Sequence, residues 1–373
     1  MAGLYIHIPF CASRCIYCGF YSTTSLKLRQ RYVDAVCQEM SLLPAPSKER
    51  GSIDTIYLGG GTPSQLTPDQ LRQLFLYINK VYENQAVEVT IEMNPDDVTP
   101  AFAEILPRLG INRVSMGAQT FDNERLRFLH RRHTATQVRQ AVTALRNAGI
   151  YNISIDLMYG FPGETLDDWQ RDIDAALSLD VEHLSAYCLM VEEGTALYER
   201  LKMKDEKLKM PNEELERQMY ELLIDKLTAV GYEHYEISNF SKPGYRSRHN
   251  SSYWNDTPYV GLGAAAHSYD GHCRSWNVAD IHQYIEAIER GELPSEQEEI
   301  DGDTHYNDRI TVALRTSDGL DLTTLSDRHR HYCMKEAQRF LDDGLLQLCD
   351  NRLSLTRKGL FVSDYMMSSL VMV

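Results

Sequence analysis

The run Phe10-Cys-Ala-Ser-Arg-Cys-Ile-Tyr-Cys-Gly-Phe20 is the most informative stretch of this 373-residue chain. It places Cys11, Cys15 and Cys18 in the spacing C-x3-C-x2-C, directly after a short apolar stretch. A closed zinc site and a cubane iron–sulfur cluster each take four ligands. Three thiolates leave one metal coordination position to a group other than cysteine. The motif therefore predicts a metal cluster with an open site.

Two other uses of these cysteines fit less well. A disulfide framework is not expected, because a chain of this length buries a sizeable core unaided and nothing at its N-terminus resembles a signal peptide. A zinc site would need a fourth ligand, and the nearest candidate, His7, lies in a strand-like run whose side chains alternate between faces. The other cysteines lack ligand spacing and are expected to be small buried apolar residues: Cys37, Cys188, Cys273, Cys333 and Cys349.

Composition and charge limit the classes of function. A hydrophobic content of 43% and a charged content of 24% describe an ordinary globular chain, long enough for two or three domains. The formal net charge of −15 argues against a protein that coats nucleic acid, because phosphate binding needs clustered lysine and arginine. This charge leaves small molecules and proteins as the expected partners. No apolar run approaches a membrane span. Because no disulfide framework is expected, we expect a reducing, cytoplasmic location.

The first half of the chain alternates β-rich runs with helix-length segments. Thr67 before Pro68 marks one helix start, and Thr165 before an acidic first turn marks another. Successive βα units predict a parallel sheet that closes into a full or partial barrel, with its chemistry on the loops that follow the strands. The six expected strands span residues 4–8, 54–58, 87–93, 112–116, 152–158 and 183–189.

Glycines or polar residues stand where each predicted strand ends. Residues 59–61 are three successive glycines, which lack Cβ atoms and so let the backbone approach a ligand closely. Glu92 and Asp156 follow apolar runs, so each carboxylate needs a partner such as a ribose hydroxyl, a ligand amine or Arg131. A structural salt bridge is the alternative interpretation of each.

The cysteine motif resembles that of the radical S-adenosylmethionine (SAM) family, in which three cysteines hold a [4Fe–4S] cluster and SAM chelates the fourth iron. The whole chain is similar to the subgroup that contains oxygen-independent coproporphyrinogen III dehydrogenase and the HemW-type haem chaperones; its residues 5–11 match the run that opens this subgroup. The resemblance implies an α/β fold: a partial (β/α)6 radical SAM barrel with a following helix over residues 1–230, and an α+β extension over residues 231–300.

Carried over position by position, the resemblance also implies a SAM site, with one or two SAM molecules. A β-branched residue at Gly60 is then expected to exclude SAM without unfolding the barrel. Met190 matches the family only by its offset along the chain, and a core methionine is the alternative. The implied SAM-binding residues are Tyr5, Gly60, Gly61, Thr62, Glu92, Gln119, Arg131, Asp156 and Met190.

Two departures separate this chain from the dehydrogenase and are typical of the haem chaperones. The dehydrogenase motif continues to a fourth cysteine, where this chain has Phe20. The dehydrogenase also has a long N-terminal extension, whereas ten residues precede Cys11 here. Activity on coproporphyrinogen is therefore not expected.

A third mark is the run His249-Asn-Ser-Ser-Tyr-Trp254, which resembles the HNxxYW signature of the haem chaperones. The resemblance implies a haem site that includes His249, Tyr253 and Trp254, since imidazole ligates haem iron and aromatic rings lie against a macrocycle. His267, which ends a run of small residues, is a second candidate ligand. A hydrogen-bonded structural histidine is the alternative interpretation of His267.

The last part of the chain, residues 301–373, is predicted to form a winged-helix-like domain. Helices are expected near residues 306–315 and 332–343, followed by short strands at 345–349 and 352–355 and a final helix. Winged helices often read DNA, but acidic residues outnumber basic ones here. We expect this domain to contact proteins or to cover the barrel instead.

Two functions remain open. The first is a haem chaperone that carries a [4Fe–4S] cluster and SAM, binds haem and transfers it to haem-requiring proteins, among which respiratory enzymes are candidate acceptors. The alternative is a radical SAM oxidoreductase that abstracts hydrogen from a porphyrinogen such as coproporphyrinogen III. In either case we expect no nucleic-acid partner and no transmembrane segment, while transient contact with a membrane stays open. Whether SAM is cleaved is not decided by the sequence.

Overall fold

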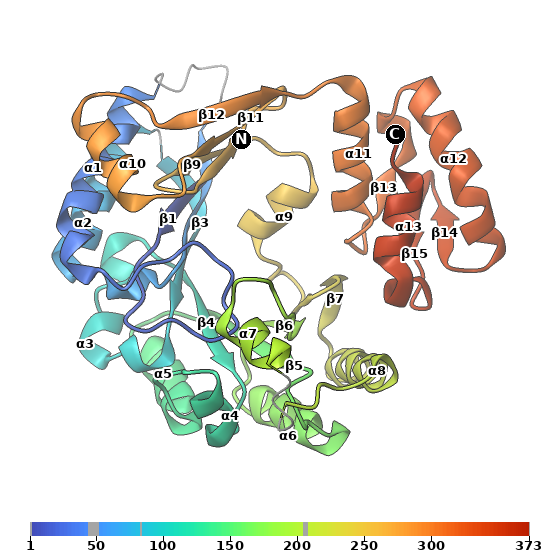
Figure 1. Ribbon diagram of the computed structural model, residues 1–373, viewed down its shortest axis with the longest axis horizontal. Coiled ribbons are helices and arrows are strands. Elements are labelled where there is room, and N and C mark those ends of the chain that lie inside the picture. Colours follow the sequence, from blue (N-terminus) through green and yellow to red (C-terminus); the bar gives the residue numbers. More distant parts are fainter. Residues whose placement is uncertain (1, 44–51, 83, 204–207, 373) are drawn as a thin grey trace.

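The computed structural model describes residues 2–43, 52–82, 84–203 and 208–372, and its centre is one twelve-stranded sheet (Figure 1). Six parallel strands stand side by side in chain order, as the sequence predicts. They are β1 (Ala2–Ile8), β2 (Ile53–Gly60), β3 (Asn84–Met93), β4 (Arg113–Gln119), β5 (Asn152–Tyr159) and β6 (His183–Cys188). The (β/α)6 arrangement is thus confirmed.

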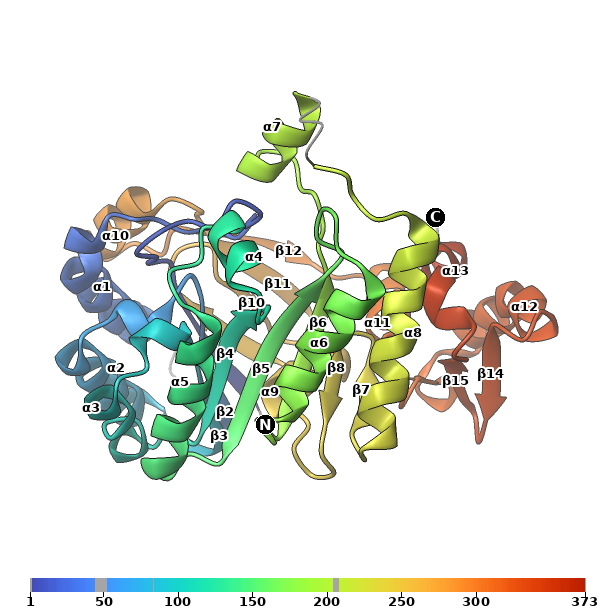
Figure 2. The same cartoon turned by 90° about the horizontal axis from the view of Figure 1, so that it is seen from below.

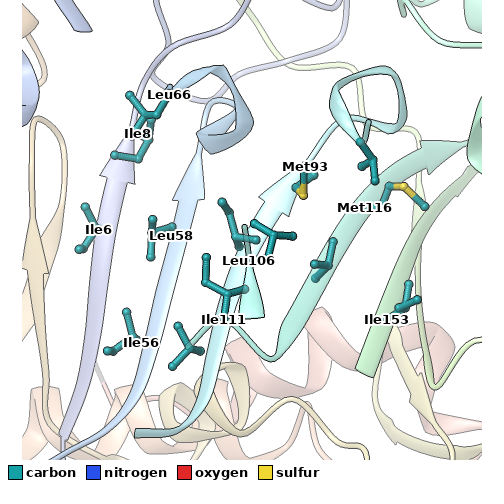
Figure 3. Packing of buried hydrophobic residues seen from close by; sticks show 14 of the residues in the cluster. Ile6, Ile8, Ile56, Leu58, Leu66, Met93, Leu106, Ile111, Met116 and Ile153 are labelled. Carbon is teal, nitrogen blue, oxygen red and sulfur yellow. The ribbon is translucent and has the colours of Figure 1, made fainter. Parts of the chain in front are cut away.

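Alternation along these strands divides the barrel into an apolar outside and a polar inside. Figure 3 shows Ile6 and Ile8 of β1 beside Ile56 and Leu58 of β2, all buried on the face that the helices cover. Because successive side chains point to opposite faces, the residues between them face the interior of the barrel. Helices α1 (Arg29–Leu42), α2 (Pro68–Val81), α5 (Ala135–Asn147) and α6 (Leu166–Leu177) pack outside the strands (Figure 2).

Both predicted helix starts are confirmed, and each is a capping box. Thr67 Oγ1 accepts a hydrogen bond from the backbone amide of Gln70 at the start of α2, and Gln70 Oε1 accepts one from the backbone amide of Thr67. Thr165 and Asp168 do the same at the start of α6. These reciprocal bonds satisfy amides that a helix terminus leaves free. The remaining helices of the first 230 residues are α3 (Pro100–Ala103), α4 (Asn123–Phe128), α7 (Ala196–Lys202) and α8 (Glu213–Ala229).

Residues 231–300 extend the same sheet at both edges. Beyond β6 lie the antiparallel strands β8 (Asn239–Ser241) and β7 (Glu233–Glu236). Beside β1 lies the parallel strand β9 (Tyr259–Leu262), followed by β10 (His267–Tyr269), β11 (Cys273–Asn277) and β12 (Ser295–Glu299). The short helix α9 (Arg248–Trp254) lies on the inner side of the sheet, whereas α10 (Ile281–Glu289) packs near α1 (Figure 1).

The C-terminal part has a hydrophobic core of its own, built around residues such as Ile310, Phe340 and Leu353. The predicted helix, helix and hairpin are present, and a short strand, β13 (Leu320–Asp321), joins the hairpin. The elements are α11 (Gly302–Ala313), α12 (Asp327–Asp342), β14 (Leu346–Cys349), β15 (Arg352–Leu355) and α13 (Ser363–Leu370). Both α11 and α12 begin several residues earlier than expected, because Asp301 and Ser326 cap them.

The domain boundaries proposed at residues 230 and 300 remain predictions. Among the described residues, no helix is both long enough and apolar enough to cross a membrane.

Candidate functional site

A cavity of about 440 Å³ opens at the carboxyl ends of the parallel strands, the end where barrel chemistry is expected. It collects residues from loops far apart in the sequence. The lining includes most of the predicted cluster and SAM residues: Cys11, Cys15, Cys18, Gly60, Gly61, Thr62, Glu92, Gln119, Arg131, Asp156 and Met190. Phe20, in place of the dehydrogenase's fourth cysteine, also lines the cavity and is 72% exposed.

The cysteine loop is fixed in the cavity by its backbone and by one apolar anchor. The Ile16 amide donates to the carbonyl of Leu129, and the Leu197 amide donates to the carbonyl of Ile16. The Ile16 side chain is buried in a small apolar cluster with Leu129, Phe161 and Leu197. Because Ile16 stands between Cys15 and Cys18, burying it holds the thiols of the loop toward the cavity.

The three thiols fit a [4Fe–4S] cluster chemically. All three are free, and Thr62 Oγ1 lies 3.6 Å from the sulfur of Cys11. Burial raises the pKa of Cys11 and of Cys18, so their thiolates need a positive charge nearby, which the iron of a cluster would supply. No three His, Cys, Asp or Glu side chains in the described parts of the chain surround one metal-ion position. A cubane instead takes each cysteine on a different iron.

Arg131 connects the cysteine loop to strands β3 and β4. Its Nη1 donates to the sulfur of Cys15 at 3.6 Å, and its Nη2 donates to Asn94 Oδ1 at 2.7 Å and to the carbonyl of Gly117 at 2.5 Å. Neighbouring phenol and thiol groups raise the pKa of Arg131 despite its burial. The guanidinium is therefore a fixed positive charge between the cysteine loop and the ends of β3 and β4.

Glu92 is a buried carboxylate at the cavity wall. The Tyr57 hydroxyl donates to its Oε1 at 2.8 Å, and the Gly60 amide donates to its Oε2 at 3.0 Å. Burial raises the pKa of Glu92 to about 7. Its partners are a hydroxyl and a backbone amide rather than a cation, which leaves the carboxylate able to accept further bonds from a ligand.

Asp156 on β5 is a second buried carboxyl group at the cavity wall. The Ser115 hydroxyl donates to its Oδ1 at 3.3 Å, and burial raises the pKa of Asp156. Glu92 and Asp156 thus face the cavity with neutral hydrogen-bond donors beside them, while the charge of buried Arg113 also acts on both carboxyl groups.

The glycines at the end of β2 are required by the fold itself. Gly60 has a φ of 104°, and a Cβ atom there would lie 2.4 Å from the His7 ring. A Cβ atom at Gly61 would lie 2.7 Å from the Pro9 backbone. A β-branched residue at Gly60 must therefore adopt a strained backbone and displace His7, so it would disturb the barrel wall as well as exclude a ligand. That the barrel stays folded with such a residue remains a prediction.

The side chain of His7 lies inside the barrel, and both of its ring nitrogens are hydrogen-bonded, so it is not a fourth metal ligand beside the cysteines. Its Nε2 bonds with the Tyr21 carbonyl oxygen at 3.1 Å, and its Nδ1 bonds with the Tyr5 hydroxyl at 3.0 Å. Tyr5, a predicted SAM residue, is thus placed next to the cavity residues rather than in the cavity lining.

Met190 is 70% exposed at the cavity, so the interpretation of Met190 as a core residue is wrong.

The HNxxYW helix, α9, places its histidine inside the barrel. His249 is fully buried; its Nδ1 bonds with Thr55 Oγ1 at 2.8 Å and its Nε2 with the Tyr253 hydroxyl at 2.9 Å. Burial lowers the pKa of His249 to about 3, so the imidazole is neutral. The third member, Trp254, faces the C-terminal part instead, with the Arg315 guanidinium 5.4 Å from its ring.

The second candidate ligand, His267, is exposed on β10 rather than built into a structural hydrogen bond. Its ring centroid lies 6.2 Å from that of Trp276, and both residues line a separate cavity of about 710 Å³ between the β10–β11 edge and α10. The wall of this cavity also includes Val278 and Pro294.

Several interior residues were not identified from the sequence. They are polar residues of β2, β3 and β4 that alternate with core residues: Thr55, Tyr57, Glu88 and Arg113. Arg113 is 1% exposed. Burial raises the pKa of Glu92 and of Asp156, and the positive charge of Arg113 partly opposes that rise. The signal that identifies this set is the period-two recurrence of polar residues within otherwise apolar strands.

Comparison with known proteins agrees with this geometry. Residues 5–176 match the family model described as the radical SAM superfamily, and residues 300–362 match the HemN C-terminal domain. The solved structure of coproporphyrinogen III oxidase (HemN) from Escherichia coli superposes with a TM-score of 0.84 at 22% identity, covering 99% of this chain and 90% of that one. The radical SAM fold with a HemN-type C-terminal domain is thereby established.

Two relatives match along nearly their whole length. The heme chaperone HemW of Bacillus subtilis is 36% identical over 368 residues, covering 96% of each chain. The heme chaperone HemW of Mycobacterium tuberculosis (strain H37Rv) is 34% identical over 375 residues, covering 99% of this chain and 94% of the relative. With the radical SAM fold, the cavity cysteines and this end-to-end similarity together, the chain belongs to the HemW family of radical SAM proteins.

Proposed function

We propose that this protein is a haem chaperone that carries a [4Fe–4S] cluster and SAM, binds haem and transfers it to haem-requiring proteins. The observation that carries the proposal is the end-to-end similarity to relatives named heme chaperone HemW. Phe20 at the position of the dehydrogenase's fourth cysteine supports it. The partners are then haem and haem-accepting proteins, with respiratory enzymes as candidates, and the proposed location is the cytoplasm.

The cavity residues would hold the cluster and SAM with separate roles. Cys11, Cys15 and Cys18 would ligate three irons of the cluster, which when bound supplies an electron-transfer centre and an iron site for SAM. The backbone of Gly60 and Gly61 would lie against the amino group of SAM. The remaining SAM contacts would come from Tyr5, Thr62, Glu92, Gln119, Arg131, Asp156 and Met190.

Glu92 is the residue with the clearest chemical role toward SAM. Its two oxygens each already accept one hydrogen bond, from Tyr57 and from Gly60, and each oxygen has a second lone pair. Ribose hydroxyls would donate to these lone pairs. The carboxylate is thereby positioned before SAM arrives, which lowers the entropic cost of binding.

The haem would be bound through the HNxxYW segment. Because both ring nitrogens of His249 are engaged and the side chain is fully buried, ligation of haem iron requires α9 to move out of the barrel. Tyr253 and Trp254 would then supply aromatic surface. His267 beside Trp276 is the alternative ligand, since it is exposed without such a movement.

Haem titration of the anaerobically reconstituted protein tests the proposal. We expect a Soret band that saturates, and we expect H249A to shift this band and weaken binding more than Y253F, because a metal ligand contributes directly to affinity. H282A, which changes an exposed histidine of α10, is the matched control and should bind haem as the wild type does.

Two results would contradict the proposal. Absence of a saturable Soret band would remove haem binding altogether. Conversion of coproporphyrinogen in the presence of SAM and an electron donor would favour the oxidoreductase alternative. An unaltered spectrum in H249A together with a shifted one in H267A would keep the chaperone function and move the ligand to His267.

A further inference from the structure

Tyr57 on β2 lies between Glu92, which lines the cavity, and His249 of the HNxxYW helix. Its hydroxyl donates to Glu92 Oε1 at 2.8 Å at the cavity wall. Its ring stacks on the imidazole of His249, with 5.1 Å between ring centroids and 25° between planes. A single rigid side chain with two rotatable bonds therefore touches both groups, and Tyr57 is 8% exposed.

The other contacts of His249 and its neighbours hold α9 against the interior of the barrel like a closed lid. The Glu88 carboxylate accepts hydrogen bonds from the backbone amides of Arg248 and His249, each at 2.9 Å. Thr55 and Tyr253 bond the two ring nitrogens of His249. The helix is thus held by a few polar contacts around one buried imidazole, a set that is made or lost as a unit.

We propose that Tyr57 couples SAM binding to the position of α9, so that SAM at Glu92 holds the helix closed and loss of SAM favours its opening. The coupling follows from geometry. When α9 leaves, the Tyr57 ring loses the imidazole that fixes it, and its hydroxyl no longer holds Glu92 in place. A ligand that prefers the ordered carboxylate therefore prefers the closed helix. The inference rests on the proposed placement of SAM at Glu92.

The coupling has a consequence for haem. Haem ligation by His249 needs the open helix, and SAM favours the closed one, so each ligand should weaken binding of the other by the same factor. SAM would then act as a release signal that returns His249 to the barrel. This gives the SAM site a role in a carrier that does not require SAM to be consumed.

Hydrogen exchange of the backbone amides in residues 248–254 tests the coupling without haem. The protein is reconstituted anaerobically with its cluster, without reductant, and measured with and without saturating SAM. In the wild type we expect SAM to slow exchange of this segment about tenfold, within the usual range of coupling between two sites. In Y57F, which keeps the ring and removes the hydroxyl, SAM should slow exchange much less.

The control is Y284F. Tyr284 is also a buried tyrosine whose hydroxyl donates to a buried carboxylate, Glu39, at 2.5 Å, but neither residue lines the cavity. Y284F should keep the full SAM effect. A second variant, T55V, removes one anchor of His249 without touching Glu92, so it should speed exchange of α9 while SAM still slows it.

The outcomes separate the coupling from the proposals on which it rests. Equal exchange with and without SAM in the wild type, or an undiminished SAM effect in Y57F, would overturn the coupling. Unchanged SAM affinity in E92Q would overturn the placement of SAM. If SAM protects α9 through Tyr57 but haem affinity is the same with and without SAM, the coupling stands and haem is bound away from His249.

Discussion

The guanidinium of Arg131 donates a hydrogen bond to the thiol of Cys15, with 3.6 Å between Nη1 and Sγ. The other end of the same guanidinium is fixed by Asn94 and by the carbonyl of Gly117. A cation held at this distance from a cluster ligand stabilises negative charge on the ligand and on the cluster. The positive charge is thus fixed among the cavity residues that we propose to bind the cluster and SAM.

Replacing Arg131 should therefore change the redox properties of the cluster. In R131M we expect the reduction potential to become more negative, because loss of a nearby positive charge disfavours the added electron. A titration followed by electron paramagnetic resonance measures the shift. R132M is the control, since Arg132 is exposed and already paired with Asp96 and Asp97. An equal shift in both variants would show that the contact with Cys15 has no special effect.

Each cysteine of the motif should be necessary for the cluster. The reconstituted wild type should contain about four irons and four sulfides per chain, the content of one cubane. Replacing Cys11, Cys15 or Cys18 with serine should abolish this content. C188S is the informative control, because Cys188 lines the same cavity outside the motif, and C37S tests a buried cysteine away from it. Iron and sulfide analysis of the wild type and of the five variants measures this content. Stoichiometric zinc in place of iron, unaffected by replacement of the motif cysteines, would contradict the cluster assignment.

SAM affinity should depend on pH through Glu92. Burial raises the pKa of Glu92 from 4.5 to about 7, so the group binds its proton as pH falls below 7 and no longer accepts as many hydrogen bonds from ribose. The dissociation constant for SAM should therefore fall about tenfold between pH 6 and pH 8, since one pKa unit corresponds to about 1.4 kcal/mol. Equilibrium binding across this range measures the effect.

The variant E92Q should bind SAM weakly and without this pH dependence. E164Q is the matched control: burial also raises the pKa of Glu164 to about 7, but this carboxylate accepts bonds from the amides of Gly160 and Phe161 and does not line the cavity.

The pH dependence of folding stability that Glu92 causes has the opposite sign to the pH dependence of SAM affinity. The folded protein holds the Glu92 proton up to a higher pH than the unfolded chain, so this group lowers the free energy of unfolding as pH rises from 4.5 through 7.

An ion pair with a buried carboxylate joins the C-terminal part to the sheet. Arg315 lies 3.1 Å from the carboxylate of Glu236, whose side chain is 1% exposed. We expect R315M to lower the free energy of unfolding by about 2–3 kcal/mol, because it leaves a buried carboxylate without its cation. Urea denaturation measures this change. R328M breaks an exposed pair with Asp303 and should cost less than about 1 kcal/mol. Similar costs for the two variants would contradict the importance of burial.

The end of the barrel that carries the cavity was largely predictable from the sequence, whereas the arrangement of the barrel interior around His249 was not. The cysteines, the glycine run and Glu92 stand at or just beyond the carboxyl ends of strands, and parallel strands bring these ends to one edge. His249 was predicted as a haem residue from its motif, and no local signal placed it inside the barrel. Its partner Thr55 is 194 residues away in the chain and its partner Glu88 is 161 residues away.

The sequence by itself determined what short-range physics controls: alternation along the chain specified the six strands, and threonine caps specified the starts of α2 and α6. The cysteine spacing predicts the cluster ligands, and that assignment stays a prediction. Tertiary structure alone decided which polar side chains share the barrel interior. A buried polar group must find a partner, and closure of the sheet decides which partners are within reach. That closure sets Tyr57 between Glu92 and His249, a relationship that no spacing in the sequence encodes.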